Sequence, residues 1–293
     1  MKRMHSLYGW GQIDEQHSRE SINSSQEILK FSLVIPTYNQ GNTIEDTLVS
    51  ILNQDYKNIE IIVIDGGSTD ETCKIIESYK DEISYFVSER DGGQSEAINK
   101  GFSSAKGDVL AWINSDDYYL PGALSCVASA MAENPRANII VGSGYIVTRD
   151  NQFLKEIPSM SMTTTNLLEW QNGKWIMQQS IFWRSDLWRV CGGVDESLDL
   201  LMDYDLWFRF AKEGYSMALG SHLAVMRYYP EVKSVALKKK NSEELAYVYA
   251  KNSAYKEVRR LVRELVDEKE RISNENQEMK SKLLYRLSKR LKR

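Results

Sequence analysis

The chain is poor in the residues that build disulfide-bonded and zinc-bound folds. Its 3 cysteines, Cys73, Cys126 and Cys191, are far apart in a sequence of 293 residues. An odd number of widely spaced cysteines argues against a disulfide framework and fits a reducing compartment. With only 3 histidines and no paired cysteines, the sequence also offers few ligands for a zinc site.

Long apolar runs are absent as well. Runs such as residues 59–64 are far too short to cross a bilayer, and no apolar segment follows the first five residues, as an ordinary secretion signal would require. Hydrophobic residues make up 42% of the chain and charged residues 27%, which is typical of a soluble globular protein. We therefore expect a cytoplasmic location.

Basic residues are scarce in most of the chain. Of 37 basic and 41 acidic residues, 17 and 9 lie from Lys238 onward, so the preceding part is strongly acidic. An acidic body argues against nucleic acid as a partner, because such binding needs a face that neutralises phosphates. An acidic cleft that holds a divalent cation remains possible.

Short apolar strands alternate with segments of helical spacing from residue 31 to residue 132. The strand-like segments are residues 31–35, 59–64, 84–87 and 108–113. The helix-like segments are residues 41–52, 70–79, 94–105 and 121–132. Pro36 is expected to stop the first strand. The alternation predicts an α/β fold with right-handed crossovers.

The rest of the chain has a more mixed pattern. Residues 139–148 resemble a strand broken at Gly142–Gly144, whereas residues 203–213 have apolar side chains on one helical face. These textures divide the chain into three predicted parts: an N-terminal extension at residues 1–30, a folded domain at 31–235 and a charged helical tail at 236–293.

The residues that follow the first four predicted strands carry most of the chemical information. In open α/β sheets the ligand lies beyond the carboxyl ends of the strands. Acidic, hydroxyl, aromatic and glycine residues occur at all four ends, in the segments Thr37–Asn39, Asp65–Ser68, Glu89–Gly93 and Asn114–Asp117. We expect these segments to meet and form a binding site.

The adjacent carboxylates of Asp116 and Asp117 indicate either a cation or a turn. Neighbouring carboxylates repel each other, and a hard cation such as Mg²⁺ or Mn²⁺ would relieve that repulsion. The alternative is a turn before a helix, since Asp often begins turns.

Three other strand-end residues allow both a binding role and a structural one. Asp65 could accept hydrogen bonds from a base or ribose, or it could begin a plain Asp-Gly-Gly turn. Tyr38 could stack on a base or belong to the core. Arg90, beside two glycines, could meet a diphosphate or be a solvated surface charge.

Asp203 and Asp205 lie in the predicted helix at residues 203–213. Positions two apart on a helix point to different sides, so one carboxylate could face a cleft and take a proton from a substrate hydroxyl. The alternative is that both cap the helix.

Phosphate-binding loops, dinucleotide-binding fingerprints and nucleophile elbows are absent from the sequence.

The ordered set of motifs resembles glycosyltransferase family 2. The motifs that carry the resemblance are Pro36–Asn39, Ile64–Asp70, Ser88–Gly93, Asn114–Asp117 with Pro121-Gly122, Phe182–Arg184, Gly192–Ser197 and Met202–Trp207. Each motif is weak alone, but their order over residues 31–230 is specific. The resemblance implies a GT-A fold, with a Rossmann-like nucleotide-sugar half at 31–120, a mixed central sheet, an acceptor half at 121–235 and C-terminal helices.

The resemblance also implies an activity. The family transfers a sugar from a nucleotide-sugar to an acceptor hydroxyl, usually with inversion. It implies that residues 175–179 lie on the acceptor side and that cell-envelope or other surface glycans are the products. The implied residue roles are nucleoside binding by Thr37, Tyr38 and Asp65, a phosphate contact by Arg90, a ribose or sugar contact by Asp116, binding of Mg²⁺ or Mn²⁺ by Asp117, general base catalysis by Asp203 and a structural role for Asp205.

Two positions depart from the family pattern. Asn114 stands where members often have another Asp, and Tyr229 stands where many have His. A second hypothesis, from another functional class, is a non-catalytic module that binds a nucleotide-sugar or scaffolds a partner. Nucleotidyl transfer is a weaker third, because the first strand lacks the glycine-rich basic loop that this chemistry uses.

The predicted tail ends in a basic segment. Seven of the fourteen residues from Lys280 to Arg293 are basic, and four leucines form one helical stripe. This pattern favours peripheral contact with the inner face of an anionic membrane, which would suit a lipid-linked acceptor. The alternative is a helix packed on its own domain or on a partner.

Overall fold

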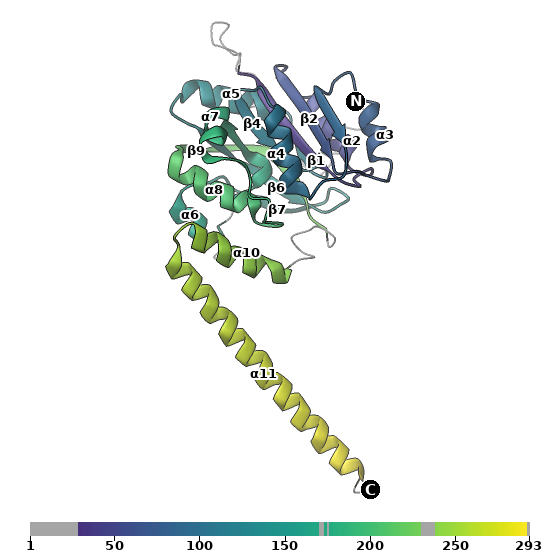
Figure 1. The fold of residues 1–293 in the computed structure, drawn as a ribbon, viewed down its shortest axis with the longest axis vertical. Helices are drawn as coiled ribbons and strands as arrows, with labels where there is room; N and C mark the ends of the chain where they lie inside the picture. The colour runs from purple at the N-terminus through teal and green to yellow at the C-terminus, as the bar shows by residue number, and fades with distance from the viewer. Residues whose placement is uncertain (1–28, 170–172, 175, 230–237, 292–293) are drawn as a thin grey trace. The chain divides into compact units, whose positions relative to one another are not determined.

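The computed structural model describes residues 29–169, 173–174, 176–229 and 238–291 (Figure 1). The predicted N-terminal extension at residues 1–30 therefore lies almost wholly outside the described residues. Contacts divide the chain into two compact units, Met1–Leu237 and Lys238–Arg293. Each unit is described by itself.

Four parallel strands in the order β3-β2-β1-β4 form the first half of the sheet. They are β1 (Phe31–Thr37), β2 (Ile59–Asp65), β3 (Tyr85–Ser88) and β4 (Val109–Trp112). The connecting helices are α2 (Ile44–Leu52), α3 (Thr72–Glu77) and α4 (Gln94–Ser104). Strands β1, β2 and β4 are buried along almost their whole length, which explains their continuous apolar sequences.

Strand β1 continues through Pro36, although the sequence predicted that it would stop there. The carbonyl of Val34 accepts a hydrogen bond from the N–H of Ile113, which follows β4, so the backbone polar groups of Val34 point toward β4. Residues two apart on a strand point their backbone groups the same way, so those of Pro36 also point toward β4. Pairing with β4 has ended by then, at Val34 and Trp112. The missing N–H of proline therefore costs no ladder hydrogen bond.

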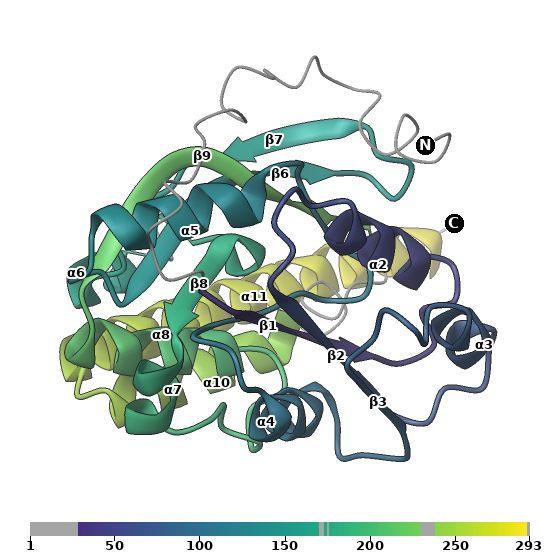
Figure 2. The same ribbon diagram turned by 90° about the horizontal axis from the view of Figure 1, so that it is seen from above.

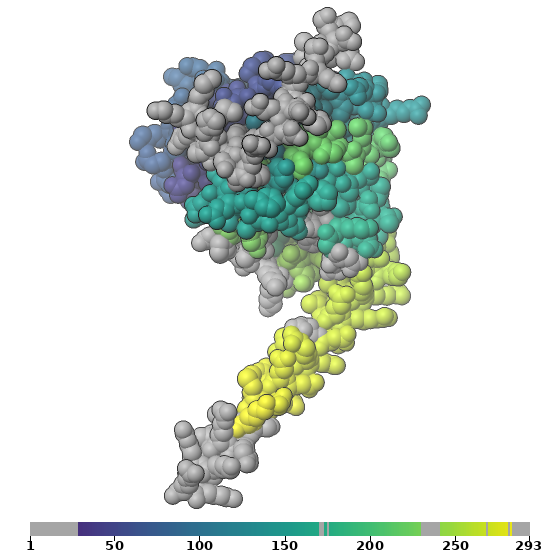
Figure 3. Space-filling view, turned by 180° about the vertical axis from the view of Figure 1, so that it is seen from behind, coloured from purple at the N-terminus to yellow at the C-terminus, as the bar shows by residue number. Residues whose placement is uncertain are grey.

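The sheet continues through β8, β6, β9 and β5, and β7 pairs with β6, which gives nine strands within the described residues. These strands are β5 (Tyr118–Tyr119), β6 (Ile139–Val147), β7 (Phe153–Ile157), β8 (Ile181–Arg184) and β9 (Ser216–Arg227). Strand β8 is antiparallel to β4 and β6, whereas β9 is parallel to β6. The predicted α/β class with a mixed central sheet is confirmed. In the space-filling view of this unit, residues of its first half (purple to blue) and of its second half (teal to green) gather on different sides (Figure 3).

Strand β6 is irregular at Gly142–Gly144 but not broken, so the predicted interruption is wrong. Its pairing with β9 shifts register on both sides of Ser143. A Cβ at Gly142 would lie 2.3 Å from the Leu223 side chain, and one at Gly144 would lie 2.1 Å from the sulfur of Met177. The glycines therefore permit close packing inside a continuous strand.

Helices cover both faces of the sheet (Figure 2). Helix α4 lies on one face with α7 (Ser185–Cys191) and α8 (Met202–Glu213), and α2 lies on the other with α5 (Ala123–Glu133). Shorter elements are α6 (Thr164–Leu168) and the 3₁₀ turn η3 (Gln178–Ser180). On the α4 face, Trp112 and Trp207 stack 5.4 Å apart, and Trp183 packs against both rings. This aromatic core fixes α8 against the sheet.

The second unit contains α10 (Lys238–Lys251) and α11 (Tyr255–Leu291). Ser253, with a left-handed φ of 63°, lies in the turn between them. Exposed i,i+4 ion pairs such as Arg271–Glu275 run along α11. The C-terminal helices are confirmed. In the part of the chain that the structure describes, no helix has the length and apolar character needed to cross a membrane.

Candidate active site

The loops after β1 and β2 are tied together at the carboxyl edge of the sheet. The N–H of Asn39 donates to Ser68 Oγ at 2.7 Å, and the N–H of Thr69 donates to Asn39 Oδ1 at 2.8 Å. Asn39 itself has a left-handed φ of 51°. The first two strand-end segments therefore meet, as the sequence predicted from the parallel order of their strands.

The loop after β3 packs directly against the loop after β2. Gly67 has a φ of 84°, and a Cβ there would lie 3.3 Å from the backbone nitrogen of Arg90. Glycine is suited to both the dihedral angle and the close approach. The side chain of Arg90 is exposed beside this contact.

Thr37 and Tyr38 leave polar and aromatic groups available at the end of β1. Thr37 is 6% exposed, and among the described residues its Oγ1 has no hydrogen-bond partner. Tyr38, the next residue, is 59% exposed. A buried hydroxyl without a partner is costly, and an incoming ligand could satisfy it. This exposure excludes the alternative that Tyr38 belongs to the core, and its contact with a base stays a prediction.

Asp65 is completely buried and organises its own loop. Its Oδ2 accepts hydrogen bonds from the N–H groups of Gly67 at 3.1 Å and Ser68 at 2.9 Å, and from Ser88 Oγ at 2.6 Å. Burial works to raise the pKa of Asp65, but the hydrogen bonds from Ser68 and Ser88 outweigh burial and hold the pKa below its ordinary value. Asp65 thus stays ionised and shapes the β2 loop. Its contact with a nucleoside stays a prediction.

Asp117 is also buried, with 1% exposure. Its Oδ1 accepts the N–H of Arg227 at 2.9 Å, and its Oδ2 accepts Gln179 Nε2 at 2.6 Å and Asn114 Nδ2 at 3.3 Å. Burial raises the pKa of Asp117 and the neighbouring Asp116 carboxylate adds to the rise, whereas Arg227 and Gln179 oppose it. Both oxygens are engaged within the protein.

The two adjacent carboxylates differ in how well they fit a divalent cation. Both Asp117 oxygens already accept hydrogen bonds inside the protein, and Oδ1 keeps a second lone pair beside its bond from Arg227. The metal role of Asp117 stays a prediction. Asp116 is half-buried, and its Oδ2 accepts the Tyr229 hydroxyl at 2.6 Å. Among the described residues, no three His, Cys, Asp or Glu side chains form a metal cluster. Asp116 fits a single contact to a cation whose other ligands would come from a diphosphate.

Tyr229 closes one side of the Asp116 carboxylate. Burial and the Asp116 carboxylate raise the pKa of Tyr229, so its hydroxyl keeps its proton and donates. The guanidinium carbon of Arg149 lies 4.4 Å from the Tyr229 ring centroid. In the sequence, Tyr229 was recognised only as a tyrosine where many family members have histidine. Its bond to Asp116 could not be foreseen, because 113 residues separate the two.

Asp203 and Asp205 lie in the first turn of α8. Asp205 is fully buried and pairs with Arg209 at 2.9 Å, while Arg209 Nη1 also donates to the carbonyls of Cys191 and Gly193. This agrees with the structural role predicted for Asp205. Asp203 is half-buried, and its Oδ1 accepts the N–H of Tyr204 at 2.7 Å. Its role as general base stays a prediction.

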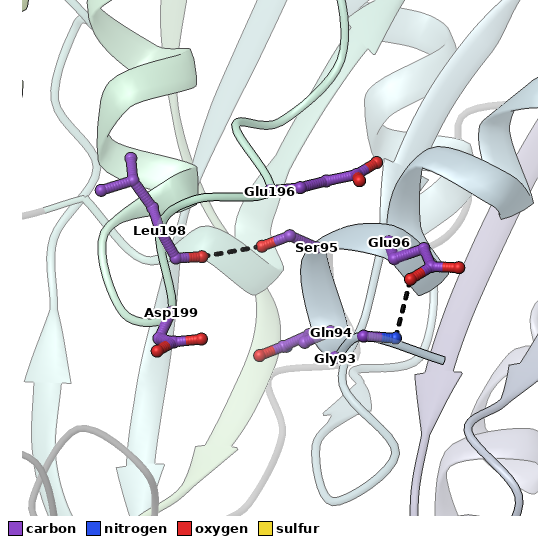
Figure 4. A pocket seen from close by; sticks show the side chains of 8 residues that line it. Gly93, Gln94, Ser95, Glu96, Glu196, Leu198 and Asp199 are labelled. Atoms are coloured by element: carbon purple, nitrogen blue, oxygen red, sulfur yellow. Dashed lines mark hydrogen bonds between the residues drawn. The ribbon is translucent and has the colours of Figure 1, made fainter. Parts of the chain in front are cut away.

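A small polar cavity lies where the loop before α8 meets the start of α4 (Figure 4). Its volume is about 90 Å³, and Gly92–Glu96 and Glu196, Leu198 and Asp199 line it. Ser95 Oγ donates to the Leu198 carbonyl at 3.0 Å, and Gln94 Nε2 donates to Asn114 Oδ1 at 2.8 Å. The segment that leads into Asp203 is thereby joined to the turn that bears Asp116.

The predicted acceptor segment at residues 175–179 is partly described. Trp175 lies outside the described residues. Gln178 Nε2 donates to the Trp112 carbonyl at the end of β4, and Gln179 holds Asp117. Sequence reasoning missed Asp46 and Arg227, which also meet here, because their chemistry is that of ordinary surface charges until the fold pairs them.

The chain is similar in sequence to proteins that are named as glycosyltransferases. The 35% identical relative "Uncharacterized glycosyltransferase" of Rickettsia typhi aligns over 62% of this chain and 58% of its own length. A Campylobacter jejuni protein named GalNAc(5)-diNAcBac-PP-undecaprenol beta-1,3-glucosyltransferase is 36% identical over 33% of this chain and 32% of its own. The chain thus spans 58% of the Rickettsia typhi protein, less than two thirds of its length.

Solved structures show the same fold at low identity. S. aureus TarS 1-349 in complex with UDP-GlcNAc has a TM-score of 0.62 and 18% identity, over 76% of this chain and 66% of that one. Mannosyltransferase PcManGT from Pyrobaculum calidifontis, in complex with GDP-Man and Mn²⁺, has a TM-score of 0.56 and 20% identity, over 77% and 64%. The sequence model described as "Glycosyl transferase family 2" matches residues 32–190, more than half of the chain. The chain therefore belongs to glycosyltransferase family 2.

Proposed function

We propose that this protein transfers a sugar from a nucleoside-diphosphate sugar to an acceptor hydroxyl with inversion. The observation that carries the proposal is the meeting of the β1, β2 and β3 loops around an unpartnered Thr37 hydroxyl and an exposed Tyr38 ring. Family membership supports it, as do the nucleotide-sugar complexes of TarS and PcManGT, which share the fold.

The proposed roles follow from what each side chain offers. Tyr38 presents an apolar face on which a base stacks, and Thr37 offers its free hydroxyl to the nucleoside beside the loop shaped by Asp65. Arg90 is exposed where it can meet phosphate oxygens. Asp116 contacts the ribose or the sugar and, together with the diphosphate, would hold the cation.

A single displacement then needs one base. Asp203 accepts the proton of the acceptor hydroxyl as the oxygen attacks the anomeric carbon, and the nucleoside diphosphate leaves from the opposite face. Inversion follows because attack and departure are in line. When bound, a divalent cation such as Mg²⁺ or Mn²⁺ would offset the charge on the departing diphosphate.

A screen of nucleotide-sugars tests the donor. Melting temperature is measured with a panel of nucleoside-diphosphate sugars, each with and without Mn²⁺, because a ligand that binds the folded state raises it by mass action. One donor should stand out, and its nucleoside diphosphate should then be released in solution. Binding without release would favour a non-catalytic module, and release of pyrophosphate would favour nucleotidyl transfer.

We further propose that the acceptor is a glycan or a lipid-linked glycan and that α11 holds the enzyme at the inner face of an anionic membrane. The Campylobacter jejuni relative is named for an undecaprenol-linked acceptor. Lys280–Arg293 holds seven basic and no acidic residues. Helix α11 runs to Leu291. In the sequence, Leu283, Leu284, Leu287 and Leu291 have the spacing of one helical stripe. We expect no nucleic-acid partner, because binding to phosphates needs basic residues but no apolar stripe.

Vesicle sedimentation tests the tail. Full-length protein should bind vesicles that contain phosphatidylglycerol and should not bind pure phosphatidylcholine. Reversing three charges, R286E with K289E and R290E, should weaken binding by at least about tenfold, since each basic residue contributes about 1 kcal/mol near an anionic surface. The matched control is K256E with R259E and R263E, three exposed positions earlier in α11. Equal loss in both variants would contradict the proposal.

A further inference from the structure

Arg227, the last residue of β9, has a buried charged side chain. Only 2% of its side chain is exposed. Removing a guanidinium from water costs several kcal/mol unless its N–H groups are satisfied. The structure satisfies them with acceptors from three separate segments.

Each nitrogen of the Arg227 guanidinium reaches a different partner. Nη2 pairs with Asp46 Oδ2 in α2 at 2.7 Å, and Nε donates to Asn151 Oδ1 at 3.1 Å. Nη1 donates to the backbone carbonyl of Asp116 at 2.9 Å. The guanidinium also lies 4.8 Å from the Tyr118 ring centroid. The planar fork of arginine suits this arrangement, and a lysine ammonium could not reproduce it.

The backbone of Arg227 reaches the same turn. Its N–H donates to Asp117 Oδ1, while Thr47 Oγ1 in α2 donates to the Asp117 carbonyl at 2.7 Å. The turn that bears Asp116 and Asp117 is therefore held by its main chain and by the buried carboxylate. The Asp116 carboxylate is left to Tyr229 and to a ligand.

We propose that Arg227 is a positioning residue for donor binding. By clamping the Asp116 carbonyl between α2 and the β6–β7 turn, it sets where the Asp116 carboxylate lies relative to the donor. Arg227 contacts no donor atom in this scheme. The inference rests on the proposed function, because it assigns a role within the same site.

Loss of the clamp should weaken donor binding in protein that is still folded. Small misplacements of a binding group lower rates steeply. In R227M we expect kcat/KM for the donor to fall by at least about tenfold and the Kd of the nucleoside diphosphate, measured by calorimetry, to rise by a similar factor. R227K should recover only part of this loss.

Arg184 offers a matched control. It is a partly buried arginine in β8 whose Nε and Nη2 donate to the carbonyls of Ala137 and Met131. Neither carbonyl lies in a segment that contacts Asp116. R184M should lower the melting temperature yet keep kcat/KM and the nucleoside diphosphate Kd within about twofold, since it removes two hydrogen bonds from the scaffold alone.

The variant D46N covers the case in which R227M does not fold. It removes only the charge that pairs with Arg227, at a side chain that is 23% exposed. D46N should raise the nucleoside diphosphate Kd by at least about threefold, with a melting temperature close to that of R184M.

The outcomes separate the two proposals. If the wild-type protein binds no nucleoside-diphosphate sugar, the proposed function fails and this inference fails with it. If the wild-type protein binds and turns over a donor, but R227M or D46N loses melting temperature without a change in Kd or kcat/KM, only the positioning role is overturned.

Discussion

Asp116 and Asp117 are neighbours in the sequence, but their surroundings separate their properties. Asp117 accepts hydrogen bonds from Arg227 and Gln179 at two buried oxygens, whereas Asp116 keeps a half-buried carboxylate beside Tyr229. The sequence pattern predicted both aspartates at a strand end, and the family resemblance implied that Asp117 binds the metal. Neither could predict which carboxylate is buried, because burial depends on partners more than 60 residues away.

Replacement of each aspartate should separate stability from binding. D117A leaves two buried donors without an acceptor and should lower the free energy of unfolding by about 3 kcal/mol. D116A should change it by less than about 1 kcal/mol and should weaken donor binding instead. Urea unfolding and calorimetry with the identified donor measure the two effects, with D150A at an exposed turn as the control. Equal stability of D117A and D116A would contradict the assignment.

Glu60 makes part of the stability sensitive to acid. It accepts hydrogen bonds from Ser32 at 2.5 Å and from the N–H of Lys106 at 2.8 Å. Burial works to raise the pKa of Glu60, but Ser32, Lys106 and Lys30 outweigh it and hold the pKa below its ordinary value. Because the folded pKa is lower than the unfolded one, Glu60 stabilises the protein above about pH 4.3, and this stability is lost as pH falls through the folded pKa.

E60Q should therefore flatten the loss of stability in acid. Free energies of unfolding at pH 6 and pH 3.5 should differ less in E60Q than in the wild type, although E60Q is less stable at pH 6. E77Q, at an exposed position in α3, serves as the control and should follow the wild-type pH dependence. A wild-type slope in E60Q would show that Glu60 does not carry this linkage.

At the scale of elements, periodicity and composition located most helices and all four parallel strands. Those signals are local, since β-branched runs mark buried strands, whereas Pro36 and the β6 glycines did not end the strands that contain them. Strands β5 and β7 and the short helix α6 were missed. Strand β5 has two residues and exists only because β9 pairs with it, and β7 is an exposed strand on the edge of β6. Tertiary pairing created these elements, and sequence patterns do not record it.

The glycines of β6 allow a prediction at this scale. G144A would place a Cβ 2.6 Å from the Ala224 carbonyl and 2.1 Å from the Met177 sulfur, and it should destabilise the protein by about 2 kcal/mol. Gly220, on β9, is exposed and has no atom near its Cβ position, so G220A should stay within about 0.5 kcal/mol of the wild type. Urea unfolding compares the two. Tolerance of G144A would show that the strand has room to shift.

At the scale of the whole molecule, the order of motifs along the chain predicted the family. The contacts divide the chain at Leu237 and Lys238, next to the predicted start of the tail at residue 236, and the division of residues 31–235 into two halves stays a prediction. The meeting of the strand ends was also foreseeable, because it follows from parallel strand order. The hydrogen bonds that join distant parts of the domain, such as those from Gln179 to Asp117 and from Ser95 to Leu198, could not be predicted from the sequence.

Turnover of the identified donor by D203N tests the central claim most directly. Wild-type protein should release the nucleoside diphosphate in the presence of an acceptor, and D203N should bind the donor with unchanged affinity while release slows by at least about 100-fold. D205N, which loses the charge of a buried pair with Arg209, should lower the melting temperature and slow release by less than about tenfold. Wild-type release rates in D203N would contradict the account.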